Sequence, residues 1–294
     1  MVAGDRRVLW LMAAPFVLGV IALILLPAFG SLAMSFFEWD LVRPPRFVGT
    51  ANLRELVGDP IFLVAVRNSL LYAAAAVPLR LVGALGIAIV LNRRGRVRTA
   101  GRVAVLIPSV MPDAAYALIW LWILNPLYGP LNQALDAAGL PTPAWLSQGT
   151  PARWAVVIMG AFQLGEGALI ALIARSQVSE ELHEIAAING AGRWSRFVRV
   201  TLPIMAPALL LIVARDTILG LQATFAPALI VTEGGPPPYS TTYLPLFVYR
   251  NAFGYLRYGY ASAATAMMLV VTASILWLQY RAVVWWRGRL GHTV

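Results

Sequence analysis

The feature that most constrains this chain is a series of long apolar stretches, each long enough to cross a lipid bilayer as a helix. A spanning helix needs about 20 mostly apolar residues. The chain is 60% hydrophobic and 12% charged, whereas soluble globular proteins carry about 25% charged residues. The sequence therefore predicts an all-α polytopic membrane bundle that forms one transmembrane domain over residues 1–294. Six transmembrane helices are expected at about 8–34, 64–91, 103–124, 154–174, 204–232 and 258–285.

The first stretch begins directly after Arg6 and Arg7 and continues to about Met34. That length exceeds the apolar region of a cleaved signal peptide, so we expect the first helix to be retained. Prolines lie inside several stretches, and membrane helices tolerate them where neighbouring groups satisfy the freed backbone.

The arginines predict the orientation of the chain. All 23 basic residues are arginine, and basic residues concentrate in the cytoplasmic loops of membrane proteins. With six spans, one side holds Arg6, Arg7, Arg93, Arg94, Arg96, Arg98, Arg102, Arg175, Arg193, Arg196, Arg199, Arg281, Arg287 and Arg289. The other side holds Arg43, Arg46, Arg54, Arg153, Arg250 and Arg257. This bias predicts that both termini and the loop 176–202 are cytoplasmic.

The composition also limits the chemistry that the chain can carry. The net charge of +10 would suggest nucleic acid binding in a soluble protein, but here the arginines serve as topology signals and no nucleic acid partner is expected. The absence of lysine removes the residue that a P-loop needs, so we expect no ATPase activity and no catalytic residues. There is no cysteine, and His183 and His292 are far apart in sequence, so no metal site is expected.

The loop 176–202 separates two apolar stretches and has helical signals of its own. Ser179 followed by two acidic residues indicates a helix start, and Asn189-Gly190 indicates its end, because both residues tolerate positive φ. A second short helix is expected from Trp194 to Thr201. The pattern predicts a helix–turn–helix at the membrane surface, and an ordinary amphipathic loop between spans is the alternative.

The residues of this loop also resemble the EAA loop of ABC-importer permeases. That pattern is Glu-Ala-Ala, three residues, Gly, nine residues, Ile, any residue, then Leu-Pro. The matching residues here are Glu184, Ile185, Ala186, Gly190, Val200, Leu202 and Pro203. Ile185 and Val200 depart from the usual Ala and Ile, and Asn189 stands where Asp usually precedes the Gly. The resemblance implies that Glu184, Ile185, Ala186, Gly190, Leu202 and Pro203 couple the chain to an ATPase.

Later segments are similar to the sugar-importer branch of these permeases, of the maltose and glycerol-phosphate type. The similar segments are 215–216, 232–236, 249–253 and 259–263. This likeness implies a multi-pass subunit of the bacterial or archaeal cytoplasmic membrane that imports a sugar, an oligosaccharide or a glycerol-phosphate ester. The implied partners are a second six-span permease, two ATP-binding cassette subunits that hold ATP and Mg, and an extracytoplasmic solute-binding protein.

The same resemblance implies a substrate site on the fourth and fifth spans, in the halves that flank the loop. Carried over, it gives Phe162, Gln163, Glu166, Leu221, Gln222 and Thr224. Amide and carboxylate groups suit sugar hydroxyls, and an aromatic face suits the ring. Ordinary interhelical hydrogen bonding is the alternative for each residue, and Arg215-Asp216 can be a mutually neutralising pair.

A secondary transporter driven by an ion gradient is the rival interpretation. Such a carrier needs acidic residues at mid-membrane for coupling, and Glu166 and Asp216 keep this alternative open. A structural membrane protein or receptor without transport is a further alternative.

Overall fold

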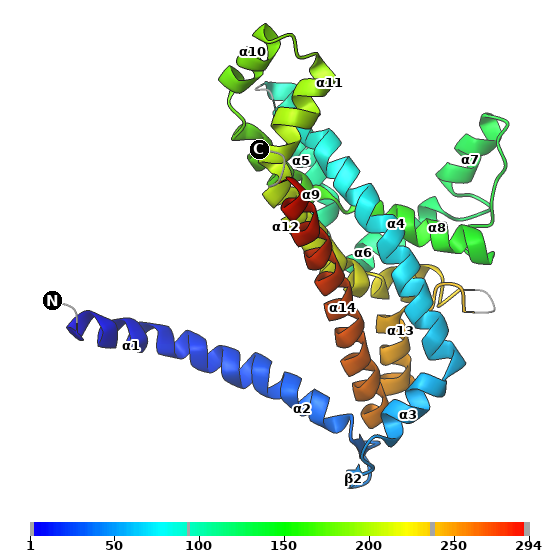
Figure 1. Cartoon of the computed structure of the whole chain (residues 1–294). Helices are drawn as coiled ribbons and strands as arrows, with labels where there is room; N and C mark the ends of the chain where they lie inside the picture. Colours follow the sequence, from blue (N-terminus) through cyan, green and yellow to red (C-terminus); the bar gives the residue numbers. More distant parts are fainter. Residues whose placement is uncertain (1–2, 93–94, 236–238, 291–294) are drawn as a thin grey trace. The chain divides into compact units, whose positions relative to one another are not determined.

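The computed structural model describes residues 3–92, 95–235 and 239–290, and these residues are mostly helical (Figure 1). The prolines expected in a turn at 236–238, and Arg93 and Arg94 of the basic loop, lie outside the described residues. The chain divides into two compact units. Unit 1 comprises Met1–Phe62 and Phe247–Val270, and unit 2 comprises Leu63–Leu246 and Val271–Val294.

Unit 1 begins with a long apolar helix that has few neighbours. It runs as α1 (Ala3–Val20), a π-helical turn (Ile21–Leu25) and α2 (Leu26–Met34). Within its apolar part, Trp10–Met34, the most apolar 18-residue window has no buried residue. Large apolar surfaces of this kind are typical of faces that meet lipid or another chain.

The rest of unit 1 is a small folded loop region around the end of that helix. Strands β1 (Phe37–Glu38) and β2 (Arg46–Phe47) form an antiparallel pair with Phe37 opposite Phe47. Unit 1 also contains α3 (Ala51–Gly58), part of α13 (Leu244–Tyr249), a π-helical turn (Arg250–Gly254), and the first residues of α4 (Pro60–Leu91) and α14 (Tyr258–Leu290). Buried Asn52 stabilises this region, because its Nδ2 donates hydrogen bonds to the carbonyls of Ser35 and Phe37 at 2.9 Å each.

Unit 2 contains most of the helices. After α4 come α5 (Arg96–Val110), α6 (Asp113–Ile123), α7 (Pro130–Ala137), α8 (Gly149–Phe162), α9 (Gly165–Ser176), α10 (Glu180–Ile188) and α11 (Arg193–Arg196). A π-helical turn (Phe197–Thr201), α12 (Leu202–Ala223) and a second π-helical turn (Pro227–Val231) follow. Helix α9 packs against both α12 and α5 (Figure 1).

Small residues allow these helices to approach closely. The core between α4, α9 and α12 contains Ala84, Ala88, Ala168, Ala171, Ala174, Val178, Met205, Leu209 and Ile212. Association of helices in lipid depends on close packing rather than on exclusion of water. Alanines on facing helices therefore stabilise this part of the fold by allowing many short backbone contacts.

Within the described residues, four helical segments are long and apolar enough to cross a membrane, or up to six if each of two bent pairs is one span. The four segments are Trp10–Met34, Pro60–Leu91, Arg193–Val231 and Tyr258–Trp285, and they correspond to the first, second, fifth and sixth predicted spans. The bent pairs, α5 with α6 and α8 with α9, correspond to the third and fourth.

The helices at the third and fourth predicted spans are therefore bent pairs rather than continuous helices. Helices α5 and α6 meet at 102°, and α8 and α9 meet at 44°. The first break follows from Pro112, which lacks an N–H and forces Met111 into an extended conformation with ψ of 141°. The second break occurs at Gln163, whose ψ of 48° ends α8 just before Gly165 begins α9.

Candidate functional site

A cavity of about 310 Å³ lies in unit 2, where the two interrupted spans meet α4 and α12. This unit 2 cavity is lined by Arg80, Ser109, Asp113, Gln163, Glu166, Arg215, Leu219, Gln222 and Ala223. Ser109 and Asp113 flank the first break, and Gln163 and Glu166 flank the second. Irregular backbone at membrane depth is tolerated where it lines a cavity, and broken helices place polar groups at such sites.

Four charged side chains form a connected group around this cavity. Arg215 on α12 forms ion pairs with Glu166 on α9 through Nη2 and with Asp216 through Nη1, the latter at 2.8 Å. Glu166 is 56% exposed, whereas Asp216 is 3% exposed. Arg80 lies near enough to Asp216 to interact with it electrostatically. Charges inside a membrane are costly unless they are paired or face a polar cavity. Glu166, Arg215 and Asp216 are paired, and Arg80 faces the cavity.

Arg80 is the most buried charged side chain of the lining. It lies on α4 with 4% of its surface exposed, and its Nε donates to the carbonyl of Gly160 at 2.6 Å. That carbonyl belongs to the last turn of α8, where carbonyls lack a full set of helical partners. Arg80 therefore helps to end α8 beside the cavity.

The structure brings part of the predicted substrate set to the cavity. Gln163, Glu166 and Gln222 line it. Phe162 is outside the lining, is 60% exposed and packs edge-on against Trp120 with ring centroids 5.3 Å apart. Leu221 and Thr224 are each 1% exposed and lie on the buried side of α12, away from the lining residues.

Sequence reasoning missed several lining residues, including Arg80, Ser109 and Asp113. Arg80 carried a usable signal, because a charged residue in the middle of an apolar span is a functional candidate by default. Ser109 and Asp113 carried a weaker signal in Pro112 between them. Within the described residues, no group of three or more His, Cys, Asp or Glu side chains is placed to hold a metal ion.

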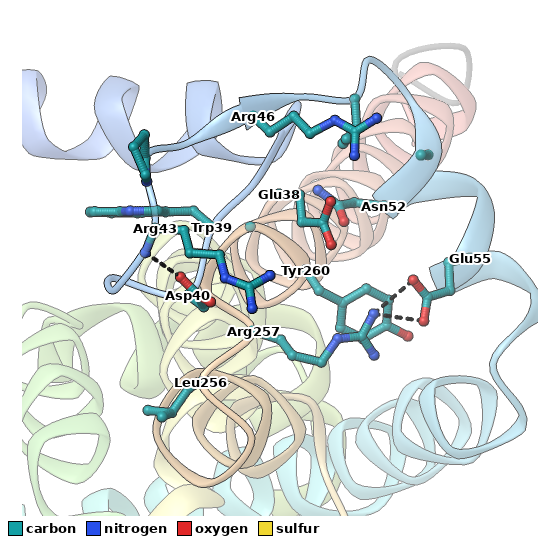
Figure 2. A pocket seen from close by; sticks show the side chains of 14 residues that line it. Glu38, Trp39, Asp40, Arg43, Arg46, Asn52, Glu55, Leu256, Arg257 and Tyr260 are labelled. Carbon is teal, nitrogen blue, oxygen red and sulfur yellow. Dashed lines mark hydrogen bonds and ion pairs between the residues drawn. The ribbon is translucent and has the colours of Figure 1, made fainter.

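Unit 1 has a pocket of its own, of about 490 Å³, lined by charged and aromatic residues (Figure 2). Arg257 binds both carboxylate oxygens of Glu55 at 2.7 Å and lies 4.3 Å above the Tyr260 ring. Asp40 accepts backbone hydrogen bonds from Arg43 at 2.8 Å and Val42 at 3.0 Å, which hold the pKa of its carboxyl below its ordinary value. Several charged side chains of this unit 1 pocket thus form their contacts with other residues of unit 1.

The predicted coupling loop forms a helix with defined ends. The Oγ of Ser179 accepts from the Leu182 N–H at 3.4 Å, as expected of an N-cap. At the other end the N–H groups of Gly190 and Ala191 donate to Ala187 and Ala186 at 3.0 and 2.9 Å, which is a Schellman motif. Gly190 has φ of 79°, the left-handed conformation that this motif requires.

The outer surface of α10 carries an uncovered apolar stripe. Leu182, Ile185 and Ile188 are 43%, 57% and 86% exposed, and Glu184 is also exposed. In Figure 1, α10 and α11 lie together at one end of unit 2, beyond α9 and α12. This small helical hairpin presents a surface that is suited to docking with another protein.

The second half of the loop is continuous with the fifth predicted span. Helix α11, the π-helical turn and α12 form part of one apolar segment, Arg193–Val231, so Leu202 and Pro203 lie inside a helix. His183 on α10 contacts this segment, since its Nε2 lies 3.3 Å from Thr201 Oγ1 and its carbonyl accepts from Arg196 at 3.4 Å. A displacement of α10 would therefore act directly on the base of α12.

Comparison with known proteins agrees with these features. Residues 84–283 match the family described as the binding-protein-dependent transport system inner membrane component. The chain is 31% identical to the probable ABC transporter permease protein YesP of Bacillus subtilis, over 93% of this chain and 89% of the relative. It is 29% identical to the lactose transport system permease protein LacF of Rhizobium radiobacter, over 93% of each.

The fold is similar to that of a solved bacterial ABC transporter involved in the import of the acidic polysaccharide alginate. The TM-score is 0.79 at 22% identity, with 95% of this chain and 96% of that chain covered. The apolar helices of the chain agree with this family and fold. The chain belongs to the family of inner membrane components of binding-protein-dependent ABC transport systems, and it is a multi-pass protein of the plasma membrane.

Proposed function

We propose that this chain is the transmembrane permease subunit of an ATP-driven importer that carries a carbohydrate delivered by an extracytoplasmic binding protein. The observation that carries the proposal is the unit 2 cavity, in which Gln163 and Glu166 at the break between α8 and α9, together with Gln222 on α12, provide hydrogen-bonding groups. Sugars require many such groups, because each buried hydroxyl needs a partner. The lactose and alginate proteins to which the chain is similar both belong to carbohydrate transport systems.

The complete assembly in this proposal has four protein components around the chain. A second six-span permease completes the pathway, two ATP-binding cassette subunits hydrolyse ATP with Mg, and a binding protein delivers the solute. In the proposed topology each bent pair is one span, giving six spans with both termini and α10 in the cytoplasm. The distribution of arginines supports this orientation.

The proposed coupling surface is α10 with its Schellman end. Glu184, Ile185 and Ala186 would occupy a cleft of the ATPase subunit, with Glu184 available for a charge-assisted contact at the rim. Closure of the ATPase pair would then displace α10 and, through the contact of His183 with Thr201, the base of α12. Leu202 and Pro203 lie where that displacement enters the span.

Purification of the tagged chain from its native membrane tests the proposal. We expect an ATP-binding subunit and a second permease to copurify, and the complex to hydrolyse ATP faster when a sugar-loaded binding protein is added. Sugar uptake by cells should stop when ATP is depleted and continue when a protonophore collapses the ion gradient. Uptake with the reverse dependence would overturn the proposal and favour an ion-driven carrier.

A further inference from the structure

The acidic residues around the unit 2 cavity contact only one of its two arginines. Both Glu166 and Asp216 contact Arg215. Arg80 forms no ion pair with any residue in the described part of the chain, although only 4% of its surface is exposed. Among the described residues its side chain donates one hydrogen bond, from Nε to the Gly160 carbonyl. The two Nη groups are left for the cavity that Arg80 lines.

Arg80 is nevertheless balanced at longer range. The group of Glu166, Arg215 and Asp216 carries one excess negative charge when all three are ionised, and Arg80 interacts electrostatically with its buried member, Asp216. The four charges therefore sum to zero. This explains how an arginine without a contacting carboxylate is tolerated at this depth.

Asp113 adds a fifth charged group to the lining, at the first turn of α6. With Asp113 ionised, the cavity and its immediate wall carry one excess negative charge. An acidic solute entering this space would increase that excess and would be repelled by it. A neutral solute leaves the balance unchanged.

A neutral sugar also matches the hydrogen-bonding groups that remain available. The free Nη groups of Arg80 are donors in a fixed planar arrangement, and they can hold two neighbouring hydroxyl oxygens. The half-exposed carboxylate of Glu166 and the amides of Gln163 and Gln222 can accept hydroxyl protons. Donors and acceptors therefore face the same space, as a polyhydroxylated ligand requires.

We propose that the unit 2 cavity admits neutral sugars and excludes acidic ones, that Arg80 binds the hydroxyls of the neutral sugar, and that the acidic residues around the cavity oppose an acidic solute. The proposal rests on the proposed function and adds the charge class of the substrate. It assigns two roles to Arg80. The guanidinium donates hydrogen bonds to sugar hydroxyls, and its charge keeps the surrounding group neutral.

Uptake by the complete transporter in proteoliposomes provides the test. Radiolabelled sugars are offered as matched pairs that differ only in oxidation of one CH₂OH group to a carboxylate, such as galactose with galacturonate and lactose with its uronate. We expect wild-type uptake of at least one neutral member, with the acidic partner transported on the order of tenfold less efficiently or worse. Efficient uptake of acidic members with none of the neutral ones would overturn the inference while leaving the importer function intact.

Three substitutions separate the roles of the charges. Glu166→Gln removes one negative charge from a half-exposed position, so it should raise the efficiency for the acidic member relative to the neutral one. Arg80→Gln should lower the apparent affinity for the neutral sugar on the order of tenfold, because it removes charged donors, and should not improve the acidic one. Arg80→Lys keeps the charge without the planar arrangement and should retain part of the neutral uptake.

The controls distinguish failure of this inference from failure of assembly or of the proposed function. Copurification of the ATPase and the thermal unfolding temperature are measured for every variant. If Arg80→Gln does not assemble, the Glu166→Gln comparison decides the inference, and an unchanged acidic-to-neutral ratio there overturns it. Absence of uptake for every sugar in the assembled wild type would instead contradict the proposed function.

Discussion

The backbone N–H of Gly165 donates to the hydroxyl of Ser109 at 3.0 Å. This bond joins the first residue of α9 to the last turn of α5, so it connects the two interrupted spans at the edge of the unit 2 cavity. Residues at an interrupted helix expose backbone donors that need partners in a membrane. Ser109 supplies one, and its position thereby fixes where the polar groups around both breaks lie.

Substitution of Gly165 by alanine is expected to disturb this junction. A Cβ atom there would lie 2.6 Å from both Ser109 Oγ and the Val105 carbonyl oxygen, and 3.1 Å from Leu106 Cα. Two of these three neighbours are backbone atoms, so the helices must shift, at a cost of about 1–3 kcal/mol. Thermal unfolding of the purified chain in detergent should show a lower transition temperature for Gly165→Ala.

Gly86→Ala is the matched control on α4. Gly86 is exposed, and a Cβ atom there meets nothing within 4 Å. Alanine in a helix interior is favoured over glycine by about 0.5–1 kcal/mol, so this variant should be as stable as the wild type or slightly more so. Equal transition temperatures for the two variants would contradict the close packing of α9 on α5.

The loop 176–202 shows which helix ends can be predicted from local sequence signals. Ser179 predicted the start of α10, and the structure confirms its capping bond. Asn189-Gly190 predicted the end, and the structure confirms a glycine with positive φ there. Both predictions succeed because a cap depends on residues within one turn of the helix end. The continuation of α11 into α12 was not predicted, since Leu202-Pro203 was read as a boundary, yet proline is tolerated in the first turn of a helix.

The cavity depends on tertiary contacts that the sequence does not encode locally. Gln163 and Glu166 were predicted from the resemblance to sugar importers, and they remain together because they flank the same break between α8 and α9. Leu221 and Thr224 share a segment with Gln222, but the rotation of α12 against its neighbours buries both and leaves Gln222 exposed. Arg80 and Ser109 come from other helices, and their approach to Gly160 and Gly165 follows from how those helices pack. Neither the rotation nor the packing can be derived from periodicity alone.

In unit 1, Asp59 is expected to matter more for stability than Glu55. Asp59 Oδ1 accepts from the N–H of Ile61 at 2.8 Å and Oδ2 accepts from the Tyr260 hydroxyl at 2.7 Å. Loss of an N-cap typically costs about 0.5–2 kcal/mol. The ion pair of Glu55 with Arg257 is about half exposed, and such pairs contribute roughly 0–1 kcal/mol. The thermal unfolding temperature should therefore be lower for Asp59→Ala than for Glu55→Ala. The opposite order would contradict the capping role of Asp59.

The cavity lining can be tested with alanine variants. Gln163→Ala should weaken transport without loss of assembly, because it removes a hydrogen-bonding group that faces the cavity. Glu166→Ala should also weaken transport. The apparent KM is expected to rise about fivefold or more for the loss of one ligand hydrogen bond. Initial uptake rates over a range of sugar concentrations measure this change.

Thr224→Ala is the control for the cavity variants. Its hydroxyl donates to the Leu221 carbonyl at 3.4 Å at the C-terminal end of α12, and Thr224 is buried and is not among the residues that line the cavity. We expect its apparent KM to stay at the wild-type value. Unchanged kinetics in both Gln163→Ala and Glu166→Ala would contradict the assignment of the cavity to the substrate.

The end of α10 gives a test of coupling to the ATPase. Gly190 is exposed, and its φ of 79° is reached more easily by asparagine than by other residues with a side chain. Gly190→Asn should therefore keep the turn, whereas Gly190→Arg adds a long side chain at the proposed docking surface. We expect Gly190→Arg to insert normally in the membrane but to release the ATPase or abolish substrate-stimulated ATP hydrolysis, and Glu184→Ala to show a milder form of the same defect.

Gly192→Ala separates docking from local strain at this turn. Gly192 has φ of −65°, and a Cβ atom there meets nothing within 4 Å, so this variant should couple normally. Membrane insertion, copurification of the ATPase and ATP turnover are measured in one preparation for all four variants. If Gly190→Arg retains the ATPase and still links hydrolysis to uptake, α10 is not the coupling helix, because an arginine at that point cannot be accommodated in a close protein interface without altering it.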